Sequence, residues 1–198
     1  MRIGSRLIGH DQPTFIIAEM SANHCGDLAL AKEIVTLAAE SGADAIKLQT
    51  YTADTMTLKS DKPWFRIEGG LWDGYTLHDL YDEAHTPWAW HAELFDEARR
   101  HGLVCFSSPF DATAVDFLEQ FNPEVYKLAS FELTDLPLVR KIAATGKPVI
   151  MSTGMANLSE IHTTVETLRA GGCHEIGVLR CVSSYPADPA DFDLATIP

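Results

Sequence analysis

Six short runs of apolar residues recur along the chain, and each has the length of one buried β-strand. The runs are almost continuously hydrophobic, which is typical of strands that are covered on both faces and are therefore parallel. They occupy residues 15–20, 45–50, 104–109, 125–130, 148–153 and 176–181. The pattern predicts six parallel strands in that order along the chain.

Helical patterns separate these runs. Apolar residues recur three or four positions apart, as in Leu30, Ile34 and Leu37, and plausible N-caps precede four of the segments, namely Asp27, Asp111, Thr134 and Asn157. Strand and helix therefore alternate along the chain. This alternation is compatible with two architectures, an open doubly wound sheet and a (β/α)8 barrel. No GxGxxG or Walker sequence follows a predicted strand, and this weakens the case for a nucleotide-binding sheet.

The stretch 51–85 is the irregular part of the chain. It is rich in Gly, Trp, Tyr and Asp, and we predict a long loop there after the second strand. Its aromatic residues favour a functional loop over a disordered one. Their rings either stack against a bound sugar or pack against one another within the loop. These residues, with two that follow the stretch, are Trp64, Trp72, Tyr75, Trp88 and Trp90.

The length of the chain bears on the choice of architecture. A barrel needs eight strands and typically about 250 residues, whereas this sequence has 198 residues and ends where a sixth helix should begin. If the barrel is correct, we expect residues 1–198 to be its N-terminal part, truncated after about six strands.

Charge and composition exclude several classes of protein. The chain has 15 Lys+Arg against 28 Asp+Glu, a formal net charge of −13, and no basic run, so neither nucleic acid nor an anionic membrane is expected as a partner. No apolar stretch is long enough for a signal sequence or a membrane span, so a cytoplasmic protein is expected. The four widely spaced cysteines predict free thiols.

Charged residues inside the apolar strands are the most informative anomaly. Glu19, Lys47 and Lys127 each lie near the carboxyl end of a predicted strand, although Lys and Glu are almost never fully buried without a partner. Carboxyl ends of parallel strands form the active face of a barrel. We therefore predict that these charges converge there with hydroxyl and amide side chains to bind an anion such as a phosphate or carboxylate. The additional side chains are Gln49, Ser107, Ser108, Ser130, Ser152 and Thr153.

Two other interpretations of the lysines stay open at this point. Lys47 and Lys127 could be internal salt-bridge partners of Glu19 and an aspartate. Alternatively, a desolvated lysine could form a Schiff base with a carbonyl substrate, as in barrel aldolases. Residue types alone do not separate these chemistries.

The histidines give weaker signals. Asn23 and His24, in the turn after the first strand, either contact a substrate or shape the loop. Five others lack metal-ligand spacing and are predicted to be solvated, namely His85, His91, His101, His162 and His174.

Six ordered blocks of sequence span essentially the whole chain, namely FIIAEMSANH, GADAIKLQTY, CFSSPFD, YKLASFE, KPVIMSTGM and LRCVSSYP. Together they resemble the motifs of the sialic acid (nonulosonic acid) synthase family. The stretch LWDGYTLHDLYDEAHTPWAWH looks most like the branch of that family that makes pseudaminic acid. The resemblance implies an α/β fold, a (β/α)8 TIM barrel followed by an antifreeze-like domain, in a homodimer. The last two barrel strands and that domain are not in this sequence.

The resemblance also implies roles for individual residues. Glu19 matches the catalytic carboxylate of the family. Five residues match positions that bind phosphoenolpyruvate, namely Lys47, Ser108, Lys127, Ser130 and Ser152. Gln49, Ser183 and Tyr185 are expected to contact the acceptor sugar; Ser183 replaces an Asn of the neuraminate branch.

The implied reaction condenses phosphoenolpyruvate with the aldehyde of an open-chain acetamido sugar, without a Schiff base, and releases phosphate. In the family a divalent metal, manganese or magnesium, polarises the aldehyde, and its two histidine ligands are expected beyond residue 198. Besides the Schiff-base aldolase, one alternative is that the truncated chain is a non-catalytic fragment that at most binds ligand.

Overall fold

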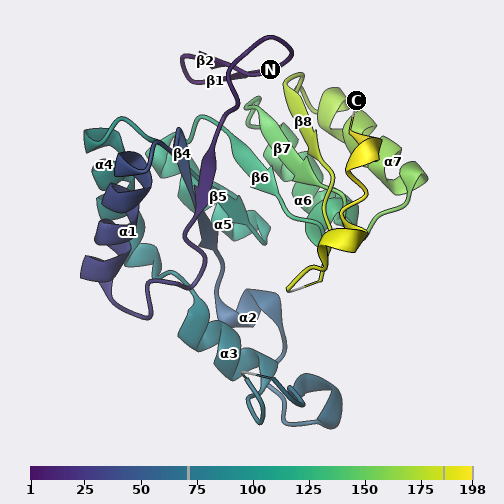
Figure 1. The fold of residues 1–198 in the computed structure, drawn as a ribbon. Helices are drawn as coiled ribbons and strands as arrows, with labels where there is room; N and C mark the ends of the chain where they lie inside the picture. The colour runs from purple at the N-terminus through teal and green to yellow at the C-terminus, as the bar shows by residue number, and fades with distance from the viewer. Residues whose placement is uncertain (71, 185, 198) are drawn as a thin grey trace. The chain divides into compact units, whose positions relative to one another are not determined.

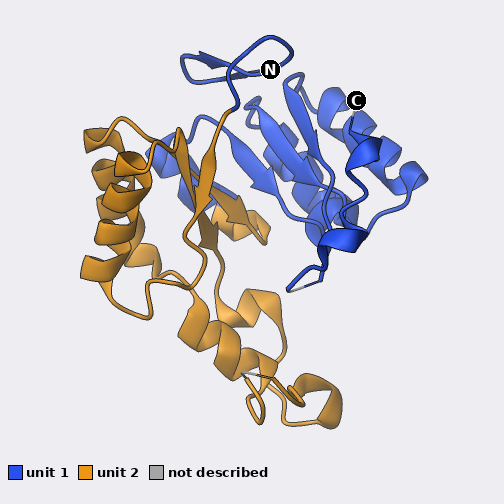
Figure 2. Cartoon of the chain, in the orientation of Figure 1, with its two compact units in different colours: residues 1–14, 115–198 blue, residues 15–114 orange. Residues whose placement is uncertain are grey.

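The computed structural model describes residues 1–70, 72–184 and 186–197. The chain divides into two compact units, residues 15–114 and residues 1–14 with 115–198 (Figure 2), and each is described by itself. The strands are β1 (Arg2–Ile3), β2 (Arg6–Leu7), β3 (Ile17–Glu19), β4 (Ala45–Thr50), β5 (Val104–Pro109), β6 (Tyr126–Leu128), β7 (Val149–Ser152) and β8 (Ile176–Leu179). The α-helices are α1 (Leu28–Glu40), α2 (Ala53–Met56), α3 (Leu77–Ala84), α4 (His91–Arg100), α5 (Ala112–Leu118), α6 (Leu136–Ala143) and α7 (Leu158–Ala170).

The unit of residues 15–114 is a parallel sheet in the order β3-β4-β5. Helices α1 and α4 pack side by side next to this sheet (Figure 1). Ile46 and Leu48 of β4, Val35 of α1 and Leu94 of α4 are all fully buried in the core of this unit. The three predicted strands in this unit are confirmed, and the first is shorter than predicted at both ends.

The second unit is a parallel sheet in the order β6-β7-β8, accompanied by α6 and α7 (Figure 1). The antiparallel hairpin β1-β2 also belongs to this unit, and Arg2 N–H donates to a Glu175 carboxylate oxygen just before β8. Tyr126 is fully buried, and its hydroxyl donates to Glu119 at 2.7 Å. All six predicted parallel strands are therefore present, alternating with helices in an α/β fold.

Two local predictions were wrong. The stretch 51–85 is not one long loop, because it contains α2 and α3; Thr76 caps α3 by accepting a hydrogen bond from Asp79 N–H at 3.1 Å. Helix α6 is capped by Asp135 rather than by Thr134, since the Asp135 carboxylate accepts from Leu138 N–H at 3.1 Å. The other three predicted caps do accept such bonds.

The prediction that His91 is solvated was also wrong. His91 is fully buried at the start of α4, and its Nε2 lies 2.8 Å from Thr50 Oγ1, which in turn lies 2.7 Å from Ser107 Oγ. Alternate residues of a strand point to opposite faces, so Thr50 and Ser107 face this helix rather than the side of the sheet that carries Lys47. Ser107 is therefore removed from the predicted anion site.

All four cysteines are free, and Cys105 and Cys173 are buried. Within the described part of the chain, no helix is long and apolar enough to cross a membrane.

His91 leads to a prediction about stability in acid. Burial lowers the pKa of His91 to about 4, from the 6.5 that is usual for a histidine in water. Between these values the unfolded chain binds a proton that the folded chain does not, so the free energy of unfolding falls as the pH falls through this window. Between pH 6.5 and about pH 4, the free energy of unfolding is expected to fall by on the order of 3 kcal/mol.

Urea unfolding between about pH 7 and pH 4 measures this loss. We expect a smaller acid dependence in His91→Gln, which cannot titrate, and the parent's dependence in His162→Gln, which changes an exposed histidine. The same acid dependence in His91→Gln and the parent would contradict the prediction.

Candidate functional site

The register of β3, β4 and β5 gathers four of the predicted site residues on one face of their sheet. Glu19 lies directly opposite Lys47, and Gln49 lies directly opposite Ser108. Because positions 47 and 49 are two residues apart, they share a face. The structure therefore brings together Glu19, Lys47, Gln49 and Ser108 at the carboxyl ends of three neighbouring strands.

Glu19 and Lys47 form an ion pair through Glu19 Oε2. The other carboxylate oxygen, Oε1, accepts a hydrogen bond from Ser21 N–H at 3.2 Å. The Lys47 side chain is 16% exposed and that of Glu19 is 38% exposed, so the pair is partly open to solvent. This pairing agrees with the salt-bridge interpretation of Lys47, and it leaves a carboxylate and an ammonium group side by side where a ligand can reach them.

Lys127 lies in the other unit, at the carboxyl end of β6, and it is buried. Its ammonium group donates to Ser152 Oγ at 2.6 Å and to the carbonyl oxygen of Leu128 at 2.7 Å. Burial lowers the pKa of Lys127 to about 8, while the charges of Cys181 and Glu132 act in the opposite direction. Near neutral pH the group is therefore mainly a cation, with a neutral fraction that an ordinary lysine does not have.

Glu132, which the sequence analysis assigned no role, lies close enough to Lys127 to act on its charge. Burial raises the pKa of Glu132, and its Oε2 is buried without a hydrogen-bond partner among the described residues. A carboxyl group in this state can hold a proton. The available signal was its position in the YKLASFE block, five residues after Lys127.

Gly154 brings two further predicted residues together in the same unit. Its N–H donates to Ser130 Oγ at 3.1 Å, and a Cβ at this position would overlap Ser183 Oγ. Ser130, Ser152 and Ser183 therefore lie in the loops and strand ends that follow β6, β7 and β8. The predicted sugar contact Tyr185 lies outside the described residues.

A metal ion does not fit the described residues of this chain. Among them, no three His, Cys, Asp or Glu side chains are grouped so that they could hold one.

Taken together, the two units carry ammonium groups, serine hydroxyls and carboxyl groups at the carboxyl ends of parallel strands. Such ammonium and hydroxyl groups are donors for a phosphate or carboxylate. Each unit also carries a carboxyl group beside its lysine, namely Glu19 paired with Lys47 and Glu132, whose pKa burial raises, near Lys127.

Comparison with known proteins decides the family. Residues 34–198 match the model of the NeuB family. The chain belongs to the NeuB family. This confirms the resemblance found in the six sequence blocks.

Two relatives are pseudaminic acid synthases. The chain is 46% identical to that of Campylobacter jejuni over 197 residues, which cover 100% of this chain and 57% of the relative. It is 48% identical to that of Helicobacter pylori over 186 residues, covering 94% of this chain and 55% of the relative. The chain thus spans a little over half the length of these relatives.

A solved structure supports the fold. It is the N-acetylneuraminic acid synthetase of Leptospira borgpetersenii, determined in complex with citrate. The two chains are 30% identical and superpose with a TM-score of 0.87, and the match covers 100% of this chain and 64% of the synthetase chain. The fold class is therefore the α/β barrel type of the sialic acid synthases, as predicted.

Gly154 leads to a prediction about ligand binding. Gly154→Ala places a methyl group against the hydroxyls of Ser183 and Ser130, so both must move. If these serines help to bind phosphoenolpyruvate, its affinity should fall by about tenfold, the effect of losing one hydrogen bond to a charged group. Calorimetric titration of the protein encoded by the full reading frame measures this.

Gly177→Ala in β8 is the matched control. Its added methyl group meets the Sδ atom of the flexible Met1 side chain at 2.9 Å, before the carboxyl end of the strand. We expect this variant to bind like the parent. Equal affinity of Gly154→Ala and Gly177→Ala would show that the Gly154 loop does not contribute to binding.

Proposed function

We propose that the protein is a phosphoenolpyruvate-dependent nonulosonic acid synthase that acts in the manner of a pseudaminic acid synthase. The observation that carries the proposal is the buried ammonium group of Lys127 at a strand end, held by Ser152, in a chain of the NeuB family. The sequence identities support the pseudaminic acid branch of the family. The chain is 46% and 48% identical to two pseudaminic acid synthases, and 30% identical to an N-acetylneuraminic acid synthetase.

The proposed reaction forms one carbon–carbon bond and releases inorganic phosphate. C3 of phosphoenolpyruvate attacks the aldehyde carbon of an open-chain acetamido sugar, and the aldehyde oxygen takes up a proton to become a hydroxyl. Water then adds to C2, and one of its protons passes to a base. The bond between C2 and the phosphate oxygen breaks as the new C2 hydroxyl becomes the ketone, and the hydroxyl proton leaves with the phosphate as hydrogen phosphate. The products are a 2-keto acid and phosphate, so atoms and charges balance.

The proposal gives a role to each site residue that the resemblance to the family implies, and to Glu132. Lys47 and Lys127, with Ser108, Ser130 and Ser152, provide donors for the anionic oxygens of phosphoenolpyruvate. Gln49, Ser183 and Tyr185 are assigned to the sugar. Glu19 accepts the proton of the attacking water, and Glu132 is the group that can deliver a proton.

Parts of this proposal concern the whole protein. We propose that the metal ligands, the last strands of the barrel and the antifreeze-like domain are supplied by residues outside this chain, and that the complete protein is a cytoplasmic homodimer. These points rest on the resemblance to the family. Sequencing the reading frame around the codons of this chain and measuring the mass of the product by light scattering test them.

The Schiff-base aldolase is the second candidate, and the neutral fraction of Lys127 is the observation that favours it. One experiment separates the two functions. The protein from the full reading frame is incubated with phosphoenolpyruvate, an acetamido sugar and manganese, and phosphate release is followed; borohydride is then added to a parallel sample. Sugar-dependent phosphate release without a reduced lysine adduct supports the synthase, whereas an adduct on Lys127 supports the aldolase.

The lysines lead to a prediction about the pH dependence of binding. With the pKa of Lys127 at about 8, the affinity for phosphoenolpyruvate should fall as the pH rises through 8, because the ammonium group loses its charge. The phosphate itself is already a dianion there, since its second pKa is about 6. Lys127→Met and Lys47→Met should each weaken binding by roughly ten- to a hundredfold at neutral pH.

Calorimetric titration at several pH values tests both parts of this prediction. Lys127→Met should also lose the fall in affinity above pH 8, whereas Lys47→Met should keep it. A parent affinity that is constant across pH 8 would remove Lys127 from the anion site.

Glu19 leads to a prediction about turnover. Glu19→Gln keeps the shape of the side chain and cannot accept the proton of water, so kcat should fall by about 10²–10⁴. Affinity for phosphoenolpyruvate should change little. Steady-state kinetics and calorimetry together measure this, and unchanged turnover would exclude Glu19 as the base.

A further inference from the structure

The loop that follows β3, residues 20–27, has an unusual backbone. Ser21 and Cys25 both have positive φ, at 48° and 49°, and Gly26 follows at 72°. A left-handed conformation is unfavourable for residues other than glycine, so the surrounding structure must hold the loop in place. The loop closes on itself through Asn23 N–H to Met20 O at 3.1 Å and Asp27 N–H to His24 O at 2.9 Å.

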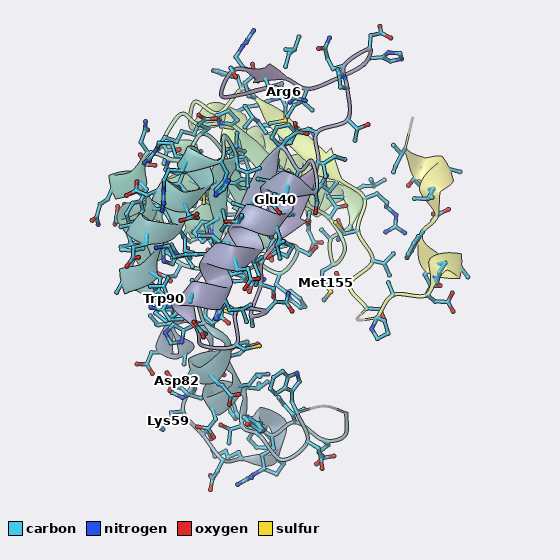
Figure 3. All side chains as sticks on the ribbon, turned by 60° about the vertical axis from the view of Figure 1, so that its left-hand side comes forward. Arg6, Glu40, Lys59, Asp82, Trp90 and Met155 are labelled. Atoms are coloured by element: carbon cyan, nitrogen blue, oxygen red, sulfur yellow. The ribbon has the colours of Figure 1, made fainter. Side chains whose placement is uncertain are left out.

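His24 is the side chain that fixes this loop to the rest of its unit. It is fully buried, and its Nδ1 accepts a hydrogen bond from Gly26 N–H at 3.1 Å. Because Nδ1 is an acceptor, the ring proton is on Nε2, which lies 3.3 Å from Thr86 Oγ1 and donates to it. The ring also meets Trp90 edge to face, with centroids 5.4 Å apart; Figure 3 labels Trp90 next to α4.

The same loop controls one of the two contacts made by the Glu19 carboxylate. Ser21 N–H donates to Glu19 Oε1, while the other oxygen faces Lys47. The positive φ of Ser21 sets the angle at which the loop leaves the plane of this amide, so the orientation of the Ser21 N–H and the position of the loop are coupled through one backbone torsion. His24 does not touch Glu19, but it fixes the backbone that does.

We propose that His24 is a positioning residue for Glu19: bound between Gly26 and Thr86 in its neutral form, it holds the loop so that Ser21 N–H fixes the Glu19 carboxylate. This rests on the role of Glu19 in the proposed function.

The surroundings of His24 keep it neutral. Burial lowers the pKa of His24, and the charge of His85 acts in the same direction. The other groups that face the ring are the hydroxyl of Thr86, the indole of Trp90 and the backbone N–H of Gly26. A proton on Nδ1 would point at the Gly26 N–H and remove the acceptor that closes the loop.

Three substitutions separate the contacts of His24. His24→Asn retains an acceptor for Gly26 N–H and loses the contact with Thr86, whereas His24→Gln retains a donor toward Thr86 and loses the acceptor. Thr86→Val keeps the shape of Thr86 and removes its hydroxyl, with little risk to folding. His162→Asn, at an exposed position of α7, is the control.

The deciding measurement is hydrogen exchange of the Ser21 amide by NMR, in the protein from the full reading frame. We expect exchange to be about tenfold faster in each of the three variants, as for the loss of one hydrogen bond, while the Val104 amide keeps its protection. The value of kcat should fall by about tenfold, with the phosphoenolpyruvate affinity unchanged within about twofold.

The outcomes distinguish this inference from the proposed function. Unchanged Ser21 exchange in Thr86→Val and in both His24 variants overturns the positioning role, as does a loss of kcat that is matched by a loss of affinity. If the parent protein shows no synthase activity, the proposed function fails, while the exchange data still decide whether His24 holds the Ser21 amide on Glu19.

Discussion

The register between parallel strands is the constraint on which the site depends. A strand shifted by one residue turns all its side chains to the other face of the sheet. Moving β3 by one position against β4 would carry Glu19 away from Lys47, and the same slip in β4 would exchange Lys47 and Gln49 for Leu48 and Thr50. Two buried residues on the helix side of β4, Ile46 and Leu48, oppose such a slip. The slip would turn their apolar side chains to the polar face of the sheet, and the free energy gained by burying them would be lost.

The two faces of these sheets use polar side chains differently. On the helix side, Thr50, Ser107 and His91 satisfy one another in a closed set of hydrogen bonds, so they add no site for a ligand. On the other face, the groups of Glu19, Lys47 and Ser108 lie at the strand ends, and Lys47 stays partly open to solvent. Burial alone therefore does not identify a functional residue, since the buried His91 is satisfied by its neighbours.

Much of the fold was predictable from sequence, because strands covered on both faces are nearly continuous apolar runs and each is followed by a helical period. The site residues on the strands were predictable for a related reason: Lys47 and Lys127 are charged residues in apolar runs. The position of Ser107 was wrongly predicted, because polar residues of one strand alternate between the two faces of the sheet and Ser107 lies on the helix side. The burial of His24 and His91 depends on contacts with residues about 40 to 60 positions away, which no local pattern contains. The role of Gly154 depends on a close approach of Ser183 that is visible only in three dimensions.

The buried position of Lys127 has a consequence for engineering the protein. Removing an ammonium group from water costs free energy at folding, and the lowered pKa of Lys127 reflects this cost. An apolar side chain of similar size would avoid it, so the fold carries a residue that its own stability does not favour. A library of variants screened only for resistance to heat is therefore expected to enrich replacements at this position. If Lys127 binds phosphoenolpyruvate as proposed, any such screen needs a ligand-binding step beside it, because the most stable clones would then be ones that no longer bind the ligand.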